Sequence, residues 1–200
     1  EQHAQYQKDG AAPEPIANAQ GGDLVCRGIQ LGPLFASQTH GYDTTDHLHI
    51  DHRLGDEDDF NALVRGCHDR GMRLILDGVF NHVGTGHPMF QVARAAGPDP
   101  QGAGAQAARW FNLRWTPGQA EPDYEVFEGH GGLVQLNHED QAVIDYVVHV
   151  MDHWLQRGAD GWRLDAAYAA PAQFWREVLA RVRALHPDAW FVGEYIHGEP

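Results

Sequence analysis

The sequence predicts an α/β protein built around a parallel β-sheet. Short, mostly apolar segments of strand length alternate with longer segments whose apolar residues recur at helical spacing. This alternation is typical of strand–helix–strand units, which build parallel sheets. One strand segment, RLILDGVF at residues 73–80, is nearly all apolar, as expected where both faces of a strand are covered.

The expected elements follow one another in a regular order. Strands are predicted over residues 28–35, 73–80, 160–167 and 189–196. Helices are predicted over residues 56–72, 139–158 and 171–186. The first helix has Asp56 at its start and Gly71 at its end, which are common start and stop signals. Pro171 takes a favoured first position of the last helix, which stops before Pro187.

Three kinds of segment divide the chain. Residues 1–27 are rich in Gln, Ala, Gly and Pro, and predict an irregular N-terminal segment. Residues 28–82 and 139–200 carry the alternation of strands and helices. Residues 83–138 interrupt it with many Gly, Pro and polar residues. This stretch is too long for a plain connection and predicts an inserted subdomain.

Composition limits the partners of the protein. Lys and Arg number 14 against 28 Asp and Glu, which gives a formal net charge of −14. This balance argues against nucleic acid or an anionic membrane as the main partner, because phosphate binding needs clustered Lys and Arg. No apolar stretch is long enough to span a membrane. Cys26 and Cys67 make neither a disulfide framework nor a metal motif. The unpaired thiols and the lack of a signal-like apolar core predict a cytoplasmic protein.

Polar side chains stand at the ends of three predicted strands. Asp77 and His82 lie at the end of the second strand, Arg163 and Asp165 at the end of the third, and Glu194 at the end of the fourth. Residues i and i+2 of a strand share one face, and catalytic groups of parallel α/β proteins gather at the carboxyl ends of strands. We therefore expect the Asp165 and Glu194 carboxylates to converge over one site.

The pair of carboxylates predicts a division of labour. Arg163 is expected to hold Asp165 ionised, which suits a nucleophile or an anionic stabiliser. Glu194 has no basic neighbour in sequence and is the better general acid. Two carboxyl groups with separated pKa values are the arrangement of glycoside hydrolysis. The alternative is a structural ion pair at a strand end.

The motifs resemble those of the α-amylase family, glycoside hydrolase family 13. DGVFNH, GWRLDAA and VGEYI occur in that order, GGLVQLNHED lies in the predicted insert, and THGYDTTDHLHIDHRLGDEDDF precedes the first motif. The resemblance covers about residues 20–200. It implies a (β/α)8 TIM barrel with a domain B inserted after the LILDGVFNH strand, of which about four strands are present here. We expect a fragment or an abridged copy of the catalytic domain, with weak or no turnover as an isolated chain.

The resemblance also assigns the reaction. It implies a retaining glycoside hydrolase that acts on α-glucosidic bonds of α-glucans or maltooligosaccharides through a covalent glycosyl-enzyme intermediate. Asp165 matches the nucleophile, Glu194 the general acid/base, and Arg163 the arginine that positions the nucleophile. The aspartate of the family's fourth region, its third catalytic carboxylate, is not in this sequence, and the helix that normally precedes GIQLGPLF is missing.

Four further residues receive substrate-binding roles from the resemblance. His82 matches the histidine that contacts the sugar before the cleaved bond, and Tyr42 matches the aromatic platform under that sugar. Asp77 matches the aspartate that orders Arg163, and Asp43 matches an acid that binds the terminal sugar in some exo-acting members. The aromatic residues of the insert either line a sugar cleft or form the subdomain's own core: Trp110, Phe111, Trp115, Tyr124 and Phe127.

No cofactor is expected. Asn81 matches a calcium ligand of many α-amylases, but Tyr168 and Ala169 stand where those enzymes carry Lys-His, which argues against such a calcium site. His149 and His153 have a zinc-like spacing, although solvent-exposed helical histidines are the simpler interpretation.

Three other functions stay open at this stage. One is a transglycosylase or isomerase that uses the same intermediate. The second is a non-catalytic carbohydrate-binding homologue. The third is a metal-dependent barrel hydrolase that uses the many histidines.

Overall fold

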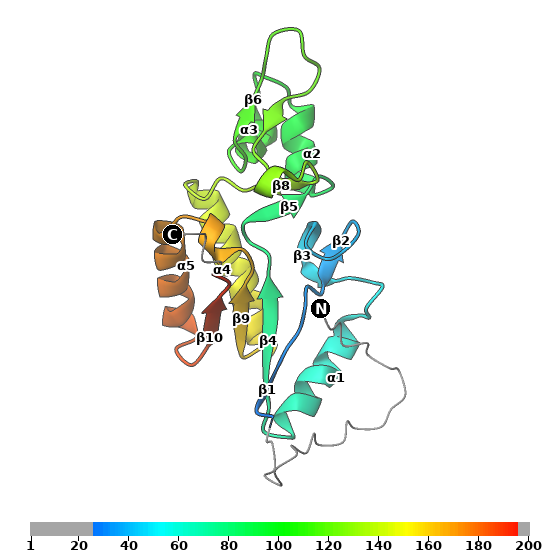
Figure 1. The fold of residues 1–200 in the computed structure, drawn as a ribbon, viewed down its shortest axis with the longest axis vertical. Helices are drawn as coiled ribbons and strands as arrows, with labels where there is room; N and C mark the ends of the chain where they lie inside the picture. Colours follow the sequence, from blue (N-terminus) through cyan, green and yellow to red (C-terminus); the bar gives the residue numbers. More distant parts are fainter. Residues whose placement is uncertain (1–25, 196–200) are drawn as a thin grey trace.

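A four-stranded parallel sheet is the centre of the computed structural model, which describes residues 26–195. Residues 1–25, most of the expected irregular segment, and residues 196–200 lie outside the described residues. The strands stand in the order β1-β4-β9-β10 (Figure 1). Their bounds are Gly28–Gln30 for β1, Arg73–Gly78 for β4, Gly161–Leu164 for β9 and Trp190–Gly193 for β10. All three pairings are parallel, so the predicted α/β class and sheet type are confirmed.

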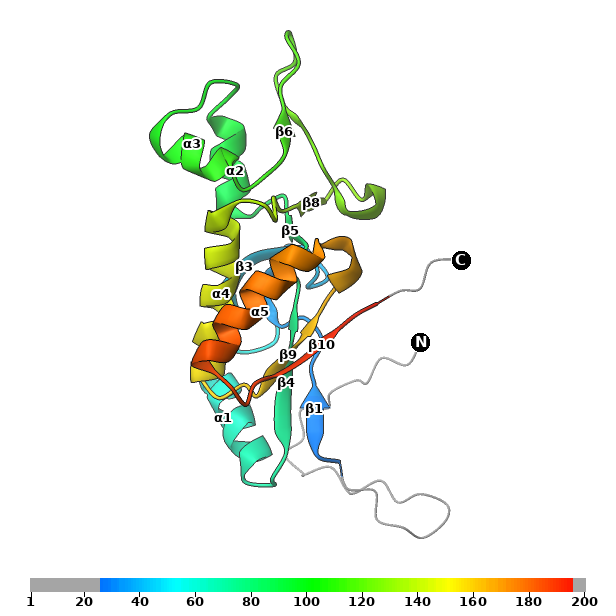
Figure 2. The ribbon, with the colours of Figure 1, turned by 90° about the vertical axis from the view of Figure 1, so that its left-hand side faces the viewer.

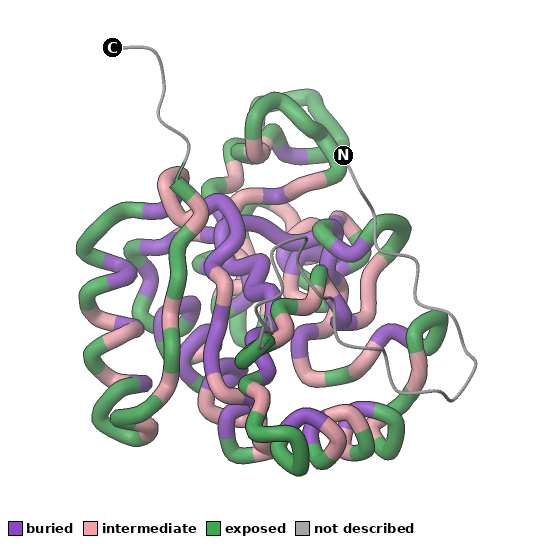
Figure 3. The backbone as a smooth tube through the Cα atoms, turned by 60° about the horizontal axis from the view of Figure 1, so that its bottom comes forward, coloured by how far each residue is buried: buried purple, intermediate pink, exposed green. Residues whose placement is uncertain are grey.

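The long helices pack on one side of this sheet (Figure 2). They are α1 (Glu57–His68), α4 (Gln141–Gln156) and α5 (Ala172–Leu185). Leu74, Leu76 and Trp162 face them and are fully buried. β4 is buried on both faces as predicted, whereas β10 is mostly exposed (Figure 3). Trp190 on β10 is 65% exposed, which distinguishes this edge strand from the covered centre of the sheet.

The predicted helices form with small shifts at their ends. Asp56 caps α1 in a capping box with Asp59, which satisfies backbone N–H groups that the first turn leaves free. α1 ends at His68 rather than at Gly71, because Asp69 to Gly71 form a turn in which Gly71 has a φ of +67°. Pro171 is the N-cap of α5 and lies one residue before the helix.

The predicted strand over residues 28–35 is wrong in its second half. The chain leaves the sheet after Gln30, and Phe35 begins a separate antiparallel hairpin. Pro33 has no N–H to donate to a ladder, which explains the break. The hairpin consists of β2 (Phe35–Ser37) and β3 (Thr44–Ile50).

A single core ties the sheet, the helices and the hairpin together. The apolar stripe of α4 is buried as predicted and packs in this core with Trp154 at its centre. Phe35 of the hairpin lies 5.2 Å from Trp154, measured between ring centroids. Gly161 lets β10 approach β9, because a Cβ at this position would stand 2.1 Å from the Trp190 carbonyl oxygen.

The segment between β4 and α4 rises above the carboxyl ends of the strands (Figure 1). Its elements are β5 (His82–Gly84), α2 (Pro88–Ala95), α3 (Gly102–Ala108), β6 (Leu113–Arg114), β7 (Asp123–Tyr124), the 3-10 turn η1 (Phe127–Gly129) and β8 (Leu133–Gln135). β5 and β8 pair antiparallel, with His82 opposite Gln135. A second 3-10 turn, η2 (Ala167–Ala169), follows β9. The division of the chain into domains stays a prediction.

Within residues 26–195, no helix is both long and apolar enough to cross a bilayer.

Candidate active site

Arg163 lies at the centre of a carboxylate cluster on the helix-free face of the sheet. In the register of β4 and β9 it stands directly beside Asp77, and Asp165 follows two residues later on the same face. Arg163 Nη1 donates to Asp77 Oδ1 at 2.8 Å, to Asp77 Oδ2 at 2.9 Å and to Asp165 Oδ1 at 2.8 Å. Strand pairing therefore fixes the orientation of both aspartates.

Glu194 joins the cluster from the end of β10. Its Oε2 atom lies 3.1 Å from Arg163 Nη2 and accepts a hydrogen bond of 2.8 Å from the Ala166 backbone N–H. Ala166 adopts a left-handed conformation with a φ of 45°, which is uncommon for a residue with a Cβ. The chain turns sharply here, next to Asp165, so that this N–H points at the glutamate. The convergence of Asp165 and Glu194 expected from the strand ends is present.

Burial affects the pKa of Asp165 more than the neighbouring Arg163 does. Burial raises the pKa of Asp165 to about 6, and the charges of Asp77 and Glu194 act in the same direction. Arg163 opposes this rise but does not overcome it. Burial also raises the pKa of Asp77. One guanidinium serves three carboxylates, so the effect of desolvation on the pKa of Asp165 exceeds the opposing effect of Arg163.

A cavity of about 410 Å³ opens over the cluster. It brings together five of the predicted site residues: Asp165, Glu194, Arg163, His82 and Tyr42. Asp77 and Asp43 are not in its wall. Asp77 acts behind the wall, through its two hydrogen bonds to Arg163.

Asp43 is a loop-forming residue in this structure. It is 6% exposed, and its carboxylate accepts hydrogen bonds from Thr39 N, Thr39 Oγ1 and His40 N. These bonds hold the short loop that carries Tyr42. Asp43 lies outside the cavity wall, and its contact with a terminal sugar stays a prediction.

His82 enters the cavity as a neutral imidazole. Burial lowers its pKa to about 4, and the backbone of Tyr42 only partly opposes this effect. Its ring stacks on Phe127 of the insert, with centroids 4.7 Å apart and planes 19° apart. Its Nε2 atom is buried without a well-formed hydrogen bond to any described residue. A polar ligand in the cavity could supply that partner.

Comparison with known proteins gives this site its context. A model of the alpha-amylase catalytic domain matches residues 22–200. The chain belongs to this family.

Three relatives illustrate the similarity. Cyclomaltodextrinase of Geobacillus thermopakistaniensis (strain MAS1) is 38% identical over 179 residues, which cover 88% of this chain and 30% of the relative. Intracellular maltogenic amylase of Bacillus subtilis is 34% identical over 177 residues, which cover 88% of this chain and 29% of the relative. The structure of cyclic α-maltosyl-(1→6)-maltose hydrolase from Arthrobacter globiformis, in complex with cyclic α-maltosyl-(1→6)-maltose, has a TM-score of 0.76 at 33% identity. That match covers 84% of this chain and 38% of the other.

The chain spans about 30% of the length of the curated relatives it matches. Its four parallel strands are part of the (β/α)8 barrel of the alpha-amylase family, and the barrel is not closed within residues 26–195. The predicted partial barrel is confirmed.

The expected absence of a cofactor, including calcium at Asn81, stays a prediction. Asn81 is fully buried and its Oδ1 atom has no hydrogen-bond partner among the described residues. Calcium takes about six to eight oxygen ligands, and over residues 26–195 no group of three or more His, Cys, Asp or Glu side chains could hold a metal ion. His149 and His153 also lack a third ligand; His153 is half-buried rather than solvated.

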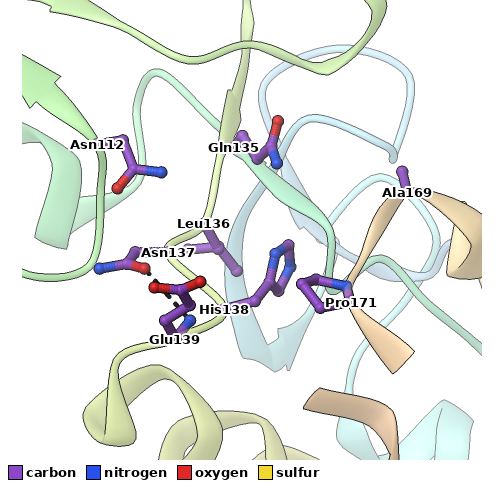
Figure 4. A pocket seen from close by; sticks show the side chains of 8 residues that line it. All are labelled: Asn112, Gln135, Leu136, Asn137, His138, Glu139, Ala169 and Pro171. Atoms are coloured by element: carbon purple, nitrogen blue, oxygen red, sulfur yellow. Dashed lines mark hydrogen bonds between the residues drawn. The ribbon is translucent and has the colours of Figure 1, made fainter. Parts of the chain in front are cut away.

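A second, smaller cavity of about 260 Å³ lies beside η2 (Figure 4). Its wall is mostly amide and apolar: Asn112, Gln135, Leu136, Asn137, His138, Glu139, Ala169 and Pro171. Glu139 is its single carboxylate, and none of the catalytic candidates lines it. The larger cavity is therefore the candidate active site of this family member.

The aromatic residues of the insert divide between the two predicted uses. Trp110 and Phe111 are buried, and Tyr124 packs against the same core. Phe127 lines the active-site cavity instead.

The sequence did not single out four other lining residues as binding groups: His40, Glu128, His130 and Tyr168. Glu128 and His130 lie in the segment DYEVFEGHGG. The clustering of aromatic and charged residues in this segment is a sequence feature that could have indicated a binding role.

Proposed function

We propose that the protein carrying this chain is a retaining glycoside hydrolase that cleaves α-glucosidic bonds of α-glucans or maltooligosaccharides. The observation that carries the proposal is the contact of one guanidinium with both Asp165 and Glu194 at the floor of a cavity. Family membership supports it, as do the relatives named cyclomaltodextrinase and maltogenic amylase.

In the first step, Asp165 attacks the anomeric carbon and the glycosidic C–O bond breaks. Glu194 gives its proton to the leaving oxygen, and a covalent glycosyl-enzyme forms. In the second step, Glu194 takes a proton from water, which attacks the same carbon and releases Asp165. The Asp165 carboxylate is mostly ionised at neutral pH because its pKa of about 6 lies below 7.

Glu194 needs a proton to act as an acid. Arg163 and the Ala166 N–H both contact the Glu194 carboxylate. Its side chain is 33% exposed, so a bound sugar would remove water from it.

The remaining residues bind and orient. Asp77 holds Arg163, which in turn fixes Asp165. His82, neutral and lacking a well-formed partner at Nε2, would hydrogen-bond to a sugar hydroxyl. Tyr42 is 36% exposed at the cavity and presents a ring on which a sugar can stack.

We also propose that the protein acts inside the cell. Cys26 and Cys67 are both free thiols, as is usual in a reducing compartment. One relative is named intracellular maltogenic amylase.

The test is hydrolysis of maltotriose and β-cyclodextrin by the full-length protein, with NMR observation of the first anomer released. The proposal predicts an α-anomer first, and a loss of at least about a thousandfold in kcat for Asp165→Asn, since removing such a group costs several orders of magnitude. Asp123→Asn, an exposed aspartate of β7, is the control and should keep full activity. Release of the β-anomer, or normal turnover by Asp165→Asn, would contradict the mechanism. Transfer products in the same spectra would identify a transglycosylase.

A further inference from the structure

Glu128 brings an additional carboxylate to the active-site cavity. It lies in η1 of the insert and lines the same wall as Phe127 and His130. Neither the sequence motifs nor the proposed mechanism uses it. Asp77, Asp165 and Glu194 lie at or just after the ends of sheet strands, whereas Glu128 belongs to the segment between β4 and α4, which lies above those strand ends (Figure 1).

A single hydrogen bond fixes the Glu128 side chain. The Tyr168 hydroxyl, from η2 beside the candidate nucleophile, donates to Glu128 Oε1 at 2.8 Å. This is the one hydrogen bond that the Glu128 side chain makes among residues 26–195. Tyr168 also lines the cavity. The pair therefore joins two walls of the cavity and leaves Oε2 without a protein donor in the described structure.

The backbone at Glu128 is unfavourable for a glutamate. Its φ of 48° and ψ of 34° place it in the left-handed region, where a residue with a Cβ is strained. Asn or Gly would be more stable at this position. Strain of this kind is concentrated at functional sites, which suggests that the carboxylate is needed where it stands.

We propose that Glu128 is a substrate-binding residue, and that Tyr168 positions it to accept hydrogen bonds from sugar hydroxyls. A carboxylate accepts hydrogen bonds from hydroxyl groups strongly, and maltooligosaccharides present hydroxyls along their length. The inference rests on the proposed function for the identity of the ligand. It adds a recognition site that is contributed by the insert.

The test separates binding from turnover. Maltotriose binding is measured by calorimetry in the full-length protein carrying Asp165→Asn, so that no hydrolysis intervenes. kcat and KM are measured in the active protein.

Glu128→Asn is the principal variant, because Asn tolerates the left-handed backbone while its amide is too short to reach Tyr168. Glu125→Gln is the control: Glu125 is exposed in the same segment, accepts one hydrogen bond from Asn112 Nδ2 at 2.6 Å, and lies outside the cavity wall.

Glu128→Asn should weaken maltotriose binding and raise KM by about tenfold, as expected for one hydrogen bond to a charged group, with kcat nearly unchanged. Its melting temperature should be at least that of the wild type. Tyr168→Phe should raise KM in the same direction, and the double variant should be no worse than Glu128→Asn. Glu128→Gln should recover part of the binding, whereas Glu125→Gln should change nothing.

Equal maltotriose affinity of the Asp165→Asn protein with and without Glu128→Asn would overturn the inference, whether or not the unmodified protein hydrolyses the sugar. Failure of the proposed function would be visible separately, as absence of hydrolysis by the unmodified protein. A fall in kcat and melting temperature without a change in KM would show a structural role only and would also overturn it.

Discussion

Asp77 and Arg163 lie side by side on neighbouring parallel strands, and Arg163 Nη1 donates to both carboxylate oxygens of Asp77. The same nitrogen donates to Asp165. Asp77 therefore determines where Arg163 stands, and Arg163 determines where the candidate nucleophile stands. The pairing of β4 and β9 therefore sets the arrangement of these three side chains.

Asp77→Asn tests this chain of contacts. An amide offers one acceptor where the carboxylate offers two, so Arg163 should be held less firmly and Asp165 should shift. We expect kcat to fall about a hundredfold, since small misplacements of reacting groups have effects of this size. Asp145→Asn, which breaks the surface pair with Arg181, is the control and should leave kcat unchanged. Unchanged kinetics in Asp77→Asn would mean that Arg163 needs no such support.

Asp43→Asn distinguishes a loop-forming role from sugar binding. The variant loses an acceptor for Thr39 Oγ1 and should loosen the loop that presents Tyr42. We expect KM to rise about threefold for maltotriose and maltoheptaose alike, as for the loss of one modest hydrogen bond. A rise confined to one chain length would instead support direct contact with a terminal sugar.

The pH dependence of kcat/KM should report Asp165. Its pKa is raised to about 6 by burial, so the carboxylate takes up a proton as the pH falls through 6 and the nucleophile is lost. We predict an acid limb centred near pH 6, which a pH–rate profile with maltotriose would measure. An acid limb centred near pH 4 would show that Arg163 dominates after all.

His47 makes stability sensitive to acid. It is fully buried, with Nε2 2.8 Å from the Val79 carbonyl oxygen and Nδ1 3.1 Å from the Tyr146 hydroxyl. Burial lowers its pKa to about 4, against the weak opposing charge of Asp46. In the unfolded chain this histidine binds a proton near pH 6.5. The contribution of neutral His47 to the free energy of unfolding is therefore complete above that pH and is lost as the pH falls toward 4.

Linkage then predicts a loss of about 2 kcal/mol of unfolding free energy from this one group between pH 7 and pH 5. His47→Gln should lose that much less over the same interval. His52→Gln, at a side chain that is 92% exposed, should behave like the wild type. Denaturant unfolding at the two pH values measures the difference, and parallel losses in His47→Gln and wild type would contradict the assignment.

Much of the fold and site could be predicted from the sequence, and the failures have physical causes. Apolar runs and helical stripes identified the sheet and α4, because burial leaves a periodic signal. The β2–β3 hairpin was missed, since Thr44–Ile50 is mostly polar and gives little of that signal. The raised pKa of Asp165 was not predicted, because the sequence shows a neighbouring arginine but not the burial and the two further carboxylates around it.

Glu128 shows a different limit. It is hydrogen-bonded to Tyr168, which lies 40 positions away in the sequence, and its own backbone is in the left-handed conformation. No local pattern in the sequence specifies such a contact. It depends on how the insert sits over the ends of the strands.

We propose that Asp165 forms a covalent bond to the sugar, and trapping of that intermediate is the sharpest test of this role. The full-length protein is incubated with a fluorinated α-glucosyl fluoride, which slows release of the glycosyl-enzyme, then digested and examined by mass spectrometry. We expect one added fluoroglucosyl group on the peptide that contains Asp165, and none in the Asp165→Asn variant. Label on a different residue, or steady hydrolysis with no labelled peptide, would contradict it.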